Sequence, residues 1–351
     1  MPGPRACCFL IPGDWTTPTG GYTYDRRLVL ALREAGWWVD VLSLSGTWPH
    51  PDAAALAAAA EMVASLADGT LVVADGLAFG AMDTVVAPHA ARLRWLALVH
   101  HPLHLETGLP EAVCQQLLGD ETRAMRHASR VVVTSQRTAQ DLAAMGVPPA
   151  RIAVVEPGTD PVDPTPMPVK TDGSLRLLCV ATLTARKGHA LLLQALAGLP
   201  HLDWTLHNVG SATRDPDTAA QLQALAAPLG ERVQWHGEVD AQALHEHFAA
   251  ADVFVLASLH EGFGMVITEA LAHGLPVVAS DAGALAQTLP ASAGLQVPAG
   301  EVAPLQAALA QVLSDAVLRA RLAAGARAAA ASLPTWPMQA AQFATVLEGV
   351  E

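Results

Sequence analysis

Short apolar runs alternate along the whole chain with longer stretches rich in alanine and leucine. This alternation is typical of βαβ units, in which buried parallel strands are joined by helices. In the first half it predicts strands over 6–11, 38–44, 69–74, 93–99 and 130–134, and helices over 22–35 and 53–66. In the second half it predicts strands over 175–181, 204–209, 233–236, 253–257 and 276–279, and helices over 190–197, 241–249, 265–273 and from 304 onward.

A stretch rich in proline, aspartate and threonine separates the two halves and is typical of an interdomain linker. At 351 residues, the chain is long enough for two domains that each bury a core. We therefore predict an α/β protein of two doubly wound, Rossmann-like lobes that face a central cleft. The lobes are expected at 1–158 and 174–336, the linker at 159–173, and a last helix at 337–351 that crosses back to the first lobe.

Composition removes several classes of function. The formal net charge of -13 argues against a nucleic-acid partner, because phosphate backbones require clustered cations. Apolar runs are interrupted well before the ~20 residues that a membrane-spanning helix needs. The four cysteines lack the paired spacing of metal ligands, and no segment resembles a signal peptide, so we expect a cytoplasmic location.

Two glutamates eight positions apart form the most specific motif. Glu261 precedes a Gly-Phe-Gly turn and Glu269 lies inside the predicted helix that follows, so both carboxylates are expected to face one pocket. Gly262 and Gly264 allow a ligand to approach the backbone, and the N–H groups of the helix start suit an anionic sugar phosphate. Glu269 is placed to accept hydrogen bonds from a ribose diol, and Glu261 from sugar hydroxyls.

Two adjacent cations, Arg186 and Lys187, stand between a predicted strand and a predicted helix. Such a turn forms a diphosphate site, in which both charges neutralise a departing nucleotide. Lys187 is one of two lysines among the 20 basic residues, which sets it apart in a chain that otherwise uses arginine. On its own, an Arg-Lys pair is as often a solvated surface feature.

A glycine-rich loop with Gly13, Gly20 and Gly21 joins the first strand to the first helix. Glycines at this place let a helix N-terminus meet a phosphate or a sugar. The loop lacks the G-x-G-x-x-G spacing, which argues against a nicotinamide or flavin enzyme.

Together, these residues resemble the retaining glycosyltransferases of family 4, which have the GT-B fold. The resemblance covers nearly the whole chain and includes the segments 274–280 and 294–298. It implies a metal-independent hexosyltransferase that moves a hexose or N-acetylhexosamine from a nucleotide diphosphate sugar, with UDP favoured, to an unidentified acceptor, without a cofactor. The first lobe is then the acceptor lobe and the second the donor lobe.

The resemblance also assigns roles to residues. It implies that Arg186 and Lys187 bind the diphosphate, that Glu269 binds the ribose, and that Glu261 holds the donor sugar. The other donor contacts that we expect are Gly20, Gly21, Gly237, Val239, Gly262, Phe263, Gly264, Met265 and Thr268.

In the first lobe, the resemblance implies that His100 lies near the anomeric centre, where its imidazole or the nearby backbone supports the developing charge. His101 follows immediately, and the register between these two histidines stays open. Asp75, His101 and Glu106 follow strands on the cleft side and are candidates for the acceptor pocket.

The chain departs from the family pattern at two positions. Trp37 stands where the family usually has a histidine, in a packing position. Ala284 stands where the family usually has a second glycine beside Gly283. Because this position borders the expected donor pocket, the added methyl group bears on which sugar or nucleotide fits.

A metal cluster of His100, His101 and His104 is not predicted. Pro102 breaks helical spacing among these histidines, and no D-x-D pair stands where a metal-dependent transferase needs one. His245 and His247 fall on opposite faces of a predicted helix and are not expected to converge.

Arg123, Arg126 and Arg130 recur with the spacing of one helical face. A solvated face with local ion pairs is favoured over contact with an anionic membrane, because the surrounding lobe is acidic. Peripheral membrane contact is therefore not predicted but stays open, and no feature of the sequence indicates the oligomeric state.

Two other functions stay open at this point. One is a nucleotide-sugar epimerase or a sugar phosphorylase on the same scaffold, and the other is a non-catalytic subunit that binds a sugar nucleotide. An epimerase changes the nucleotide sugar without releasing nucleotide, whereas a binding subunit is stabilised by nucleotide and turns nothing over.

Overall fold

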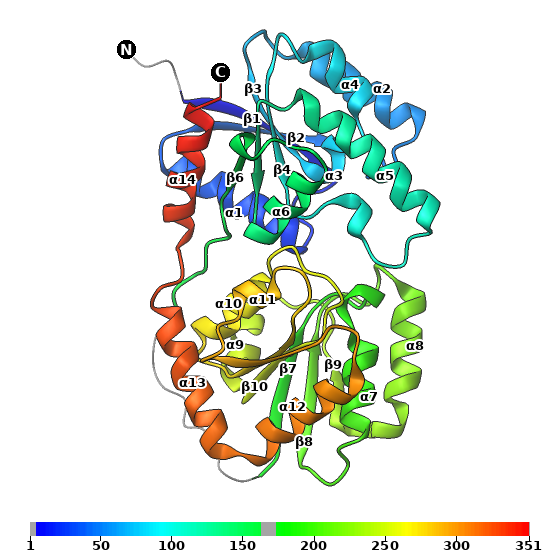
Figure 1. Cartoon of the computed structure of the whole chain (residues 1–351), viewed down its shortest axis with the longest axis vertical. Coiled ribbons are helices and arrows are strands. Elements are labelled where there is room, and N and C mark those ends of the chain that lie inside the picture. Colours follow the sequence, from blue (N-terminus) through cyan, green and yellow to red (C-terminus); the bar gives the residue numbers. More distant parts are fainter. Residues whose placement is uncertain (1–4, 163–172, 351) are drawn as a thin grey trace. The chain divides into compact units, whose positions relative to one another are not determined.

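The computed structural model describes residues 5–162 and 173–350, which form two compact units (Figure 1). Unit 1 comprises Met1–Gly158 and Pro334–Glu351, and unit 2 comprises Thr159–Leu333. Most of the predicted linker, at 163–172, lies outside the described residues.

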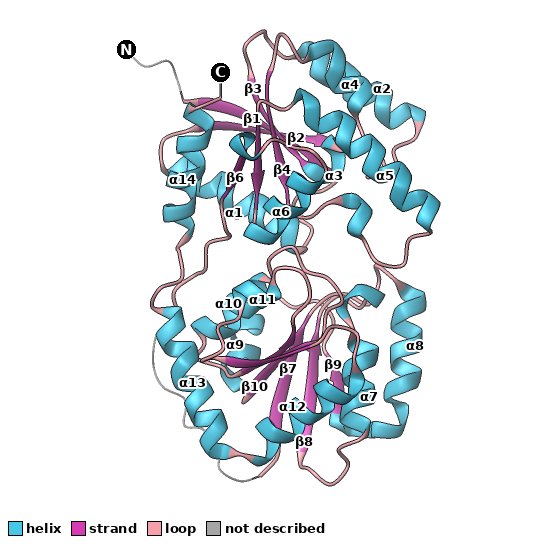
Figure 2. Ribbon diagram, viewed as in Figure 1, coloured by secondary structure: helices cyan, strands magenta, loops and turns pink. Residues whose placement is uncertain are grey.

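Unit 1 has, within its described part, a sheet of six parallel strands in the order β2-β1-β3-β4-β5-β6 (Figure 2). The strands are β1 (Ala6–Pro12), β2 (Trp38–Leu44), β3 (Leu71–Asp75), β4 (Arg94–Val99), β5 (Arg130–Val133) and β6 (Ile152–Val154). The helices are α1 (Gly20–Glu34), α2 (Ala53–Ser65), α3 (Gly76–Phe79), α4 (Asp83–Val86), α5 (Glu111–Ala124), α6 (Gln136–Ala144) and α14 (Trp336–Glu348). The last helix packs on α1, where the Trp336 ring meets the edge of Tyr24 at 5.8 Å between centroids.

Unit 2 repeats the architecture, again counting described residues, with six parallel strands in the order β12-β11-β10-β7-β8-β9 (Figure 2). The strands are β7 (Leu175–Val180), β8 (Trp204–Val209), β9 (Val233–Trp235), β10 (Val253–Leu256), β11 (Val277–Ser280) and β12 (Gly294–Val297). The helices are α7 (His189–Ala197), α8 (Pro216–Ala226), α9 (Ala241–Ala250), α10 (Met265–Ala272), α11 (Leu285–Thr288), α12 (Val302–Ser314) and α13 (Ala316–Ala330). Both units are therefore Rossmann-like, which confirms the predicted α/β class.

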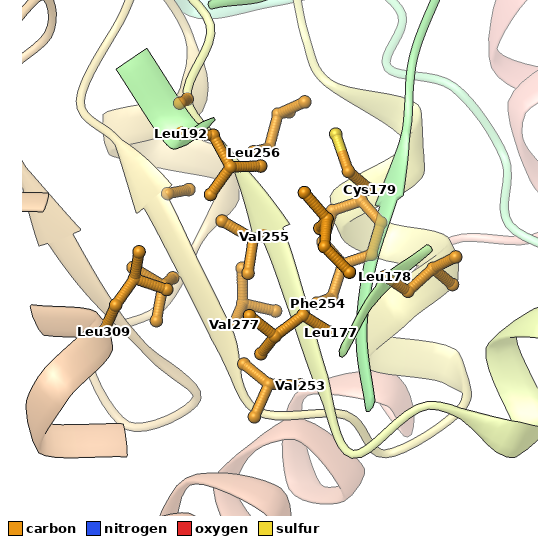
Figure 3. Packing of buried hydrophobic residues seen from close by; sticks show 14 of the residues in the cluster. Leu177, Leu178, Cys179, Leu192, Val253, Phe254, Val255, Leu256, Val277 and Leu309 are labelled. Atoms are coloured by element: carbon orange, nitrogen blue, oxygen red, sulfur yellow. The ribbon is translucent and has the colours of Figure 1, made fainter. Parts of the chain in front are cut away.

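The central strands are mostly apolar because helices cover both faces of a parallel sheet. Every residue of β3 and of β10 is buried. In unit 2, side chains of β7, β10 and β11 meet those of α7 and α12 in one core (Figure 3). Its labelled members are Leu177, Leu178, Cys179, Leu192, Val253, Phe254, Val255, Leu256, Val277 and Leu309.

Each sheet contains one place where the direction of strand addition reverses. It falls between β1 and β3 in unit 1, and between β7 and β10 in unit 2. The loops that leave the two flanking strands diverge there, and ligands of α/β proteins bind beside the carboxyl ends of such strands. The loops after these four strands are therefore the first places to look for a site.

Every strand and helix predicted by residue range is present, and the ends shift by at most two residues except in the last helix, which ends at Glu348 and not at 351. The pattern missed β6, which has three residues, and β12, which begins with a glycine. It also missed α5, whose polar residues obscure the helical period, together with α6, α8 and the four-residue helices α3, α4 and α11.

The prediction that Arg123, Arg126 and Arg130 share one helical face is wrong. Arg123 lies in α5, Arg126 in the 3-10 helix Met125–His127, and Arg130 begins β5, because the chain leaves the helix after Ala124. Arg123 forms ion pairs with Asp120 and Asp83. None of the helices within 5–162 and 173–350 has the length and apolar character that a membrane crossing requires.

Candidate active site

The loops at the switch point of unit 2 bring together three charged side chains. Arg186 and Lys187 lie in the 3-10 turn Ala185–Lys187 after β7, and Glu261 lies in the loop after β10. Lys187 Nζ lies 2.6 Å from Glu261 Oε1, and Arg186 Nη1 lies 3.6 Å from Glu261 Oε2. These residues form what we call the Glu261 cluster.

Glu261 is held as a buried carboxylate. Its side chain is about 8% exposed, and Ser258 Oγ donates a 2.6 Å hydrogen bond to Oε1. Burial raises the pKa of this carboxyl, but Lys187 and then Arg186 outweigh burial and, with the hydrogen bonds, lower the pKa to about 2. Glu261 is therefore ionised at neutral pH, and it orients both cations.

Backbone contacts lock the two loops of this cluster to each other. The Leu259 N–H donates to the Arg186 carbonyl at 2.7 Å, and Arg186 Nη1 donates to the His260 carbonyl at 2.9 Å. Gly188 has a φ of +67°, and a Cβ there would lie 1.9 Å from the Ala257 carbonyl oxygen. A side chain at position 188 would force the loops apart, which explains the glycine after the Arg-Lys pair.

The loop after β11 supports Glu261 from the other side. A Cβ on Gly283, whose φ is +60°, would lie 2.3 Å from the Glu261 carbonyl oxygen. The Ala284 N–H donates to that same oxygen at 2.9 Å, and the Ala284 side chain is fully buried. The departure from the family pattern at 284 is thus accommodated inside the fold, next to the backbone of Glu261.

Helix α10 starts directly after the Gly-Phe-Gly turn. Gly264 is its N-cap with a φ of +88° and offers no side-chain acceptor to the first N–H groups. Glu269 lies within α10 with a half-buried side chain. Thr268 is buried and donates its hydroxyl proton to the Met265 carbonyl, so this predicted donor contact is engaged inside unit 2.

The expected nucleobase loop follows β9. Gly237 has a φ of +69°, and its carbonyl accepts the Gly210 N–H at 2.8 Å. Val239 packs against the core of unit 2. This loop is therefore anchored at both residues that the sequence singled out.

The predicted site residues of unit 1 lie after β1, at the end of β3 and after β4. Gly20 and Gly21 begin α1, Asp75 ends β3, and His100 follows β4. Asp75 Oδ1 accepts the Leu77 N–H at 2.7 Å and so caps α3.

His100 lies against the first turn of α1. A Cβ on Gly21 would approach His100 Cδ2 to 3.1 Å, so the absence of a side chain at 21 makes room for the ring. His100 Nε2 is 3.0 Å from Asp25 Oδ1 and 3.6 Å from Asp75 Oδ2. The sequence reasoning missed Asp25, although an aspartate amid the apolar positions of α1 is a detectable signal.

Burial and charge oppose each other in this second group. Burial lowers the pKa of His100, but Asp25 and Asp75 outweigh burial, so that the pKa lies above the ordinary value. Burial, reinforced by Asp25, raises the pKa of Asp75 well above its usual range. Asp75 therefore keeps its proton at a pH where an exposed aspartate has lost it.

The neighbouring histidines do not join His100. His101 Nε2 lies 3.4 Å from Glu106 Oε2, and His104 Nδ1 lies 3.6 Å from Glu121 Oε2. His101 and His104 therefore each lie beside a carboxylate that is not near His100.

Two groups among the described side chains have donor atoms close enough to hold a metal ion: Asp25, Asp75 and His100, and separately His207, His236 and His247. In the second group, Arg176 Nη2 lies 2.9 Å from His247 Nδ1. This guanidinium competes with a metal cation there. His245 instead pairs with His273 at 3.1 Å, so His245 and His247 do belong to separate groups, as predicted.

Two family models match the chain. The model of the glycosyltransferases of family 4 matches residues 18–163, and the model of the glycosyl transferases of group 1 matches residues 174–315. Together they cover most of both units.

Relatives and solved structures agree with these models. A D-inositol 3-phosphate glycosyltransferase of Xylanimonas cellulosilytica is 32% identical over 264 residues, which cover 67% of this chain and 63% of the relative. A GDP-mannose-dependent monoacylated alpha-(1-6)-phosphatidylinositol monomannoside mannosyltransferase of Corynebacterium glutamicum is 29% identical over 51% of this chain and 48% of its own. The matched part of this chain thus covers less than two thirds of the first relative and about half of the second.

Two solved structures share the fold. Sucrose-phosphate synthase of Thermosynechococcus elongatus superposes with a TM-score of 0.80 at 23% identity, over 98% of both chains. The Anabaena protein Alr3699/HepE in complex with UDP superposes with a TM-score of 0.73 at 21% identity, over 98% of this chain and 100% of its own. The two Rossmann-like units thus make up the GT-B fold. Within this class, the chain belongs to glycosyltransferase family 4.

Proposed function

We propose that this protein transfers a hexose or N-acetylhexosamine from a nucleotide diphosphate sugar to an acceptor hydroxyl, with retention of anomeric configuration and without a metal. One observation carries the proposal: the Glu261 cluster joins an ionised carboxylate to two cations in loops at the switch point of unit 2. A diphosphate requires fixed positive charge, and a sugar requires acceptors for its hydroxyls.

The donor's diphosphate is proposed to bind Arg186 and Lys187. Arginine has five N–H donors and lysine has three, so both can bond Glu261 and still donate to phosphate oxygens. Because Glu261 already orients these cations, little reorganisation is needed when charge grows on the departing diphosphate. Glu261 accepts from the donor sugar, Glu269 accepts from the ribose, and the first N–H groups of α10 face an anionic oxygen.

Transfer then follows a front-face route. The bond between the anomeric carbon and the diphosphate oxygen breaks, and the acceptor oxygen bonds to the same face of that carbon. The acceptor's proton passes to the oxygen of the departing diphosphate. This route requires no protein nucleophile, and the two cations and the helix N-terminus supply positive charge.

Unit 1 is proposed to bind the acceptor, with His100 beside the anomeric carbon and Asp75, His101 and Glu106 near the acceptor. Of the two adjacent histidines, we assign the role to His100 because it follows β4 directly and lies against Gly21. We propose UDP as the nucleotide, as in the Anabaena complex, with GDP as the rival because one relative is named as GDP-mannose-dependent. The relatives' names make inositol phosphates the first acceptors to test.

We also propose that the protein works in the cytoplasm. All four cysteines are free thiols, and Cys7 and Cys8 are buried side by side in β1 without a disulfide. Free thiols are typical of a reducing compartment.

The test combines a donor screen with product analysis. The EDTA-treated protein is incubated with UDP- and GDP-linked glucose, N-acetylglucosamine and mannose and with inositol phosphates, and nucleotide release is measured. Proton NMR of the product reads the anomeric configuration. We expect acceptor-dependent nucleotide release with a retained configuration.

Other outcomes contradict the proposal in distinct ways. Inversion of the anomeric centre, or activity that requires added metal, would refute the mechanism. An altered nucleotide sugar with no nucleotide release would identify an epimerase. Thermal stabilisation by nucleotide, without turnover of any acceptor, would favour a binding subunit.

A further inference from the structure

Asp25 is a buried acid in the middle of a helix, with no role in the reaction described above. It lies in α1, its side chain is fully buried, and its Oδ2 atom has no hydrogen-bond partner among the described residues. Burying a carboxyl group that is not fully hydrogen-bonded is unfavourable, because the group loses its contacts with water. An acid at this position therefore calls for an explanation beyond packing.

Three contacts tie helix α1 to His100, and one of them is made by Asp25. Oδ1 lies 3.0 Å from His100 Nε2, within hydrogen-bond distance. The preceding residue, Tyr24, meets the same imidazole edge-on at 5.3 Å between centroids. Gly21, one turn earlier in α1, leaves the space that the Cδ2 edge of the ring occupies. One face of α1 thus packs against the imidazole ring and holds it in place.

The hydrogen bond determines which nitrogen of His100 remains for a ligand. A carboxylate oxygen accepts, so Nε2 carries the proton and Nδ1 is left to contact a bound molecule. The side chain of His100 is 24% exposed, so a bound molecule can reach the ring. Partners of this kind orient metal-bound and catalytic histidines in other proteins.

We propose that Asp25 is a positioning residue that fixes the ring orientation and the protonation of His100, so that Nδ1 faces the reacting sugar. The inference rests on the proposed function for the role of His100 in transfer. It does not rest on that function for the contact between the two side chains.

The groups that face His100 support this assignment. They are Tyr24 and Asp25 from α1 and Asp75 from the end of β3. Burial and the neighbouring Asp25 raise the pKa of Asp75 well above its usual range, so Asp75 is the weaker acceptor for Nε2–H. Asp25, which is also nearer to Nε2, is therefore the partner that sets the state of the ring.

The first test is spectroscopic and needs no substrate. The imidazole signals of His100, assigned by their loss in His100→Gln, are titrated by NMR in the full-length wild type and in Asp25→Asn. We expect the pKa of His100 to fall in Asp25→Asn, because the variant removes an acidic group 3.0 Å from Nε2. An unchanged titration would overturn the proposal.

The second test is kinetic. Asp25→Asn should lower kcat by about 10- to 100-fold, the scale seen for residues that orient a functional histidine, with the donor KM within about twofold. The limb of the kcat profile that reports His100 should move to lower pH. If kcat and its pH profile equal those of the wild type, Asp25 has no positioning role.

Matched variants separate positioning from general destabilisation. Asp83→Asn removes a second Asp–His contact of 3.0 Å in unit 1, to His127, and should leave kcat and the His100 titration unchanged. Gly21→Ala keeps Asp25 but directs a methyl group at the ring, so it should lower kcat in the same way as Asp25→Asn. Equal losses in Asp83→Asn would overturn the assignment.

The same design separates this proposal from the proposed function. A lowered His100 pKa in a protein that transfers no sugar would keep the contact and refute the function. Sugar transfer by the wild type, together with an unchanged His100 titration in Asp25→Asn, would support the proposed function and refute the role of Asp25. The donor atoms of Asp25, Asp75 and His100 are also close enough to hold a metal ion, so all samples are treated with EDTA. If the difference in His100 titration between the wild type and Asp25→Asn appears only after Zn²⁺ or Mn²⁺ is added, the proposal is overturned.

Discussion

The two units place carboxylates at equivalent positions, beside the strands that flank the switch point, yet they treat them in opposite ways. In unit 2, two cations surround Glu261 and lower its pKa to about 2. In unit 1, Asp25 and Asp75 share a single imidazole, and burial raises the pKa of Asp75. Unit 2 thus holds a fixed ion cluster suited to a diphosphate, whereas unit 1 holds a group whose protons can redistribute.

The largest effect is expected from the cation of the unit 2 cluster. Lys187→Ala removes the charge nearest to Glu261 and should lower kcat by about 100-fold or more, the scale of a lost transition-state donor. Steady-state kinetics with the donor found in the screen measure the effect. Arg137→Ala, which removes an arginine paired with Asp141 on the exposed surface of unit 1, is the control and should retain full activity. Comparable activity in Lys187→Ala and Arg137→Ala would contradict the view that unit 2 holds the cations that bind the diphosphate.

The ionised state of Glu261 should appear in the pH dependence of stability. Its folded pKa of about 2 lies below the unfolded value of about 4.3, so it contributes stability above the unfolded pKa that is lost as pH falls toward the folded pKa. Glu261→Gln should therefore lower the free energy of unfolding by about 3 kcal/mol at pH 7 and by progressively less between about pH 5 and pH 2. Urea titrations of both proteins across this range measure the gap. A gap that does not change with pH would show that Glu261 is not held as an ion.

The close approach of the two loops in unit 2 should be intolerant of a side chain. Gly188→Ala combines a φ of +67° with a Cβ 1.9 Å from a carbonyl oxygen, and should destabilise by at least about 2 kcal/mol. Gly300→Ala, also in unit 2, has a φ of +82° but its nearest neighbour is 3.8 Å away, so it should lose about 1 kcal/mol. Denaturant unfolding compares the two. Equal losses in the free energy of unfolding would mean that the two loops can move apart without a loss of stability.

The smallest effect is expected at Asp75 in unit 1, where a substitution should raise stability and not lower it. The raised pKa of Asp75 means that its ionised form opposes folding above the unfolded pKa of about 3.9, and that this cost vanishes below it. Asp75→Asn keeps a side-chain oxygen to cap α3 and should raise the free energy of unfolding at pH 7 and change it little at pH 4. Thermal melts at both pH values test this. A loss of stability at pH 7 would contradict the contrast between the units.

Sequence patterns were enough for the elements and for part of the site. Continuous apolar strands such as β3 and β10 and the turn glycines are local signals, so the fold class followed from them. The Glu261 cluster was predictable because its residues lie in short, recognisable motifs directly after strands. The strand order that brings the loops after β7 and β10 together is not a local property, so the ion pair between Lys187 and Glu261 required the structure.

Asp25 and the three-histidine group escaped prediction for the same reason. Asp25 meets His100 across 75 residues of chain, through the packing of α1 against the end of β4. His207, His236 and His247 come from β8, the loop after β9, and α9. The helix period correctly separated His247 from His245, but only the sheet order supplies the partners of His247.

Titration calorimetry with UDP and GDP tests the central claim most directly, since it measures whether the Glu261 cluster binds a nucleotide diphosphate. We predict that the wild type binds one of the two nucleotides, that Lys187→Ala weakens this binding by about 10-fold or more, and that Asp25→Asn leaves it within about twofold. Equal affinity in the wild type and in Lys187→Ala would contradict the account.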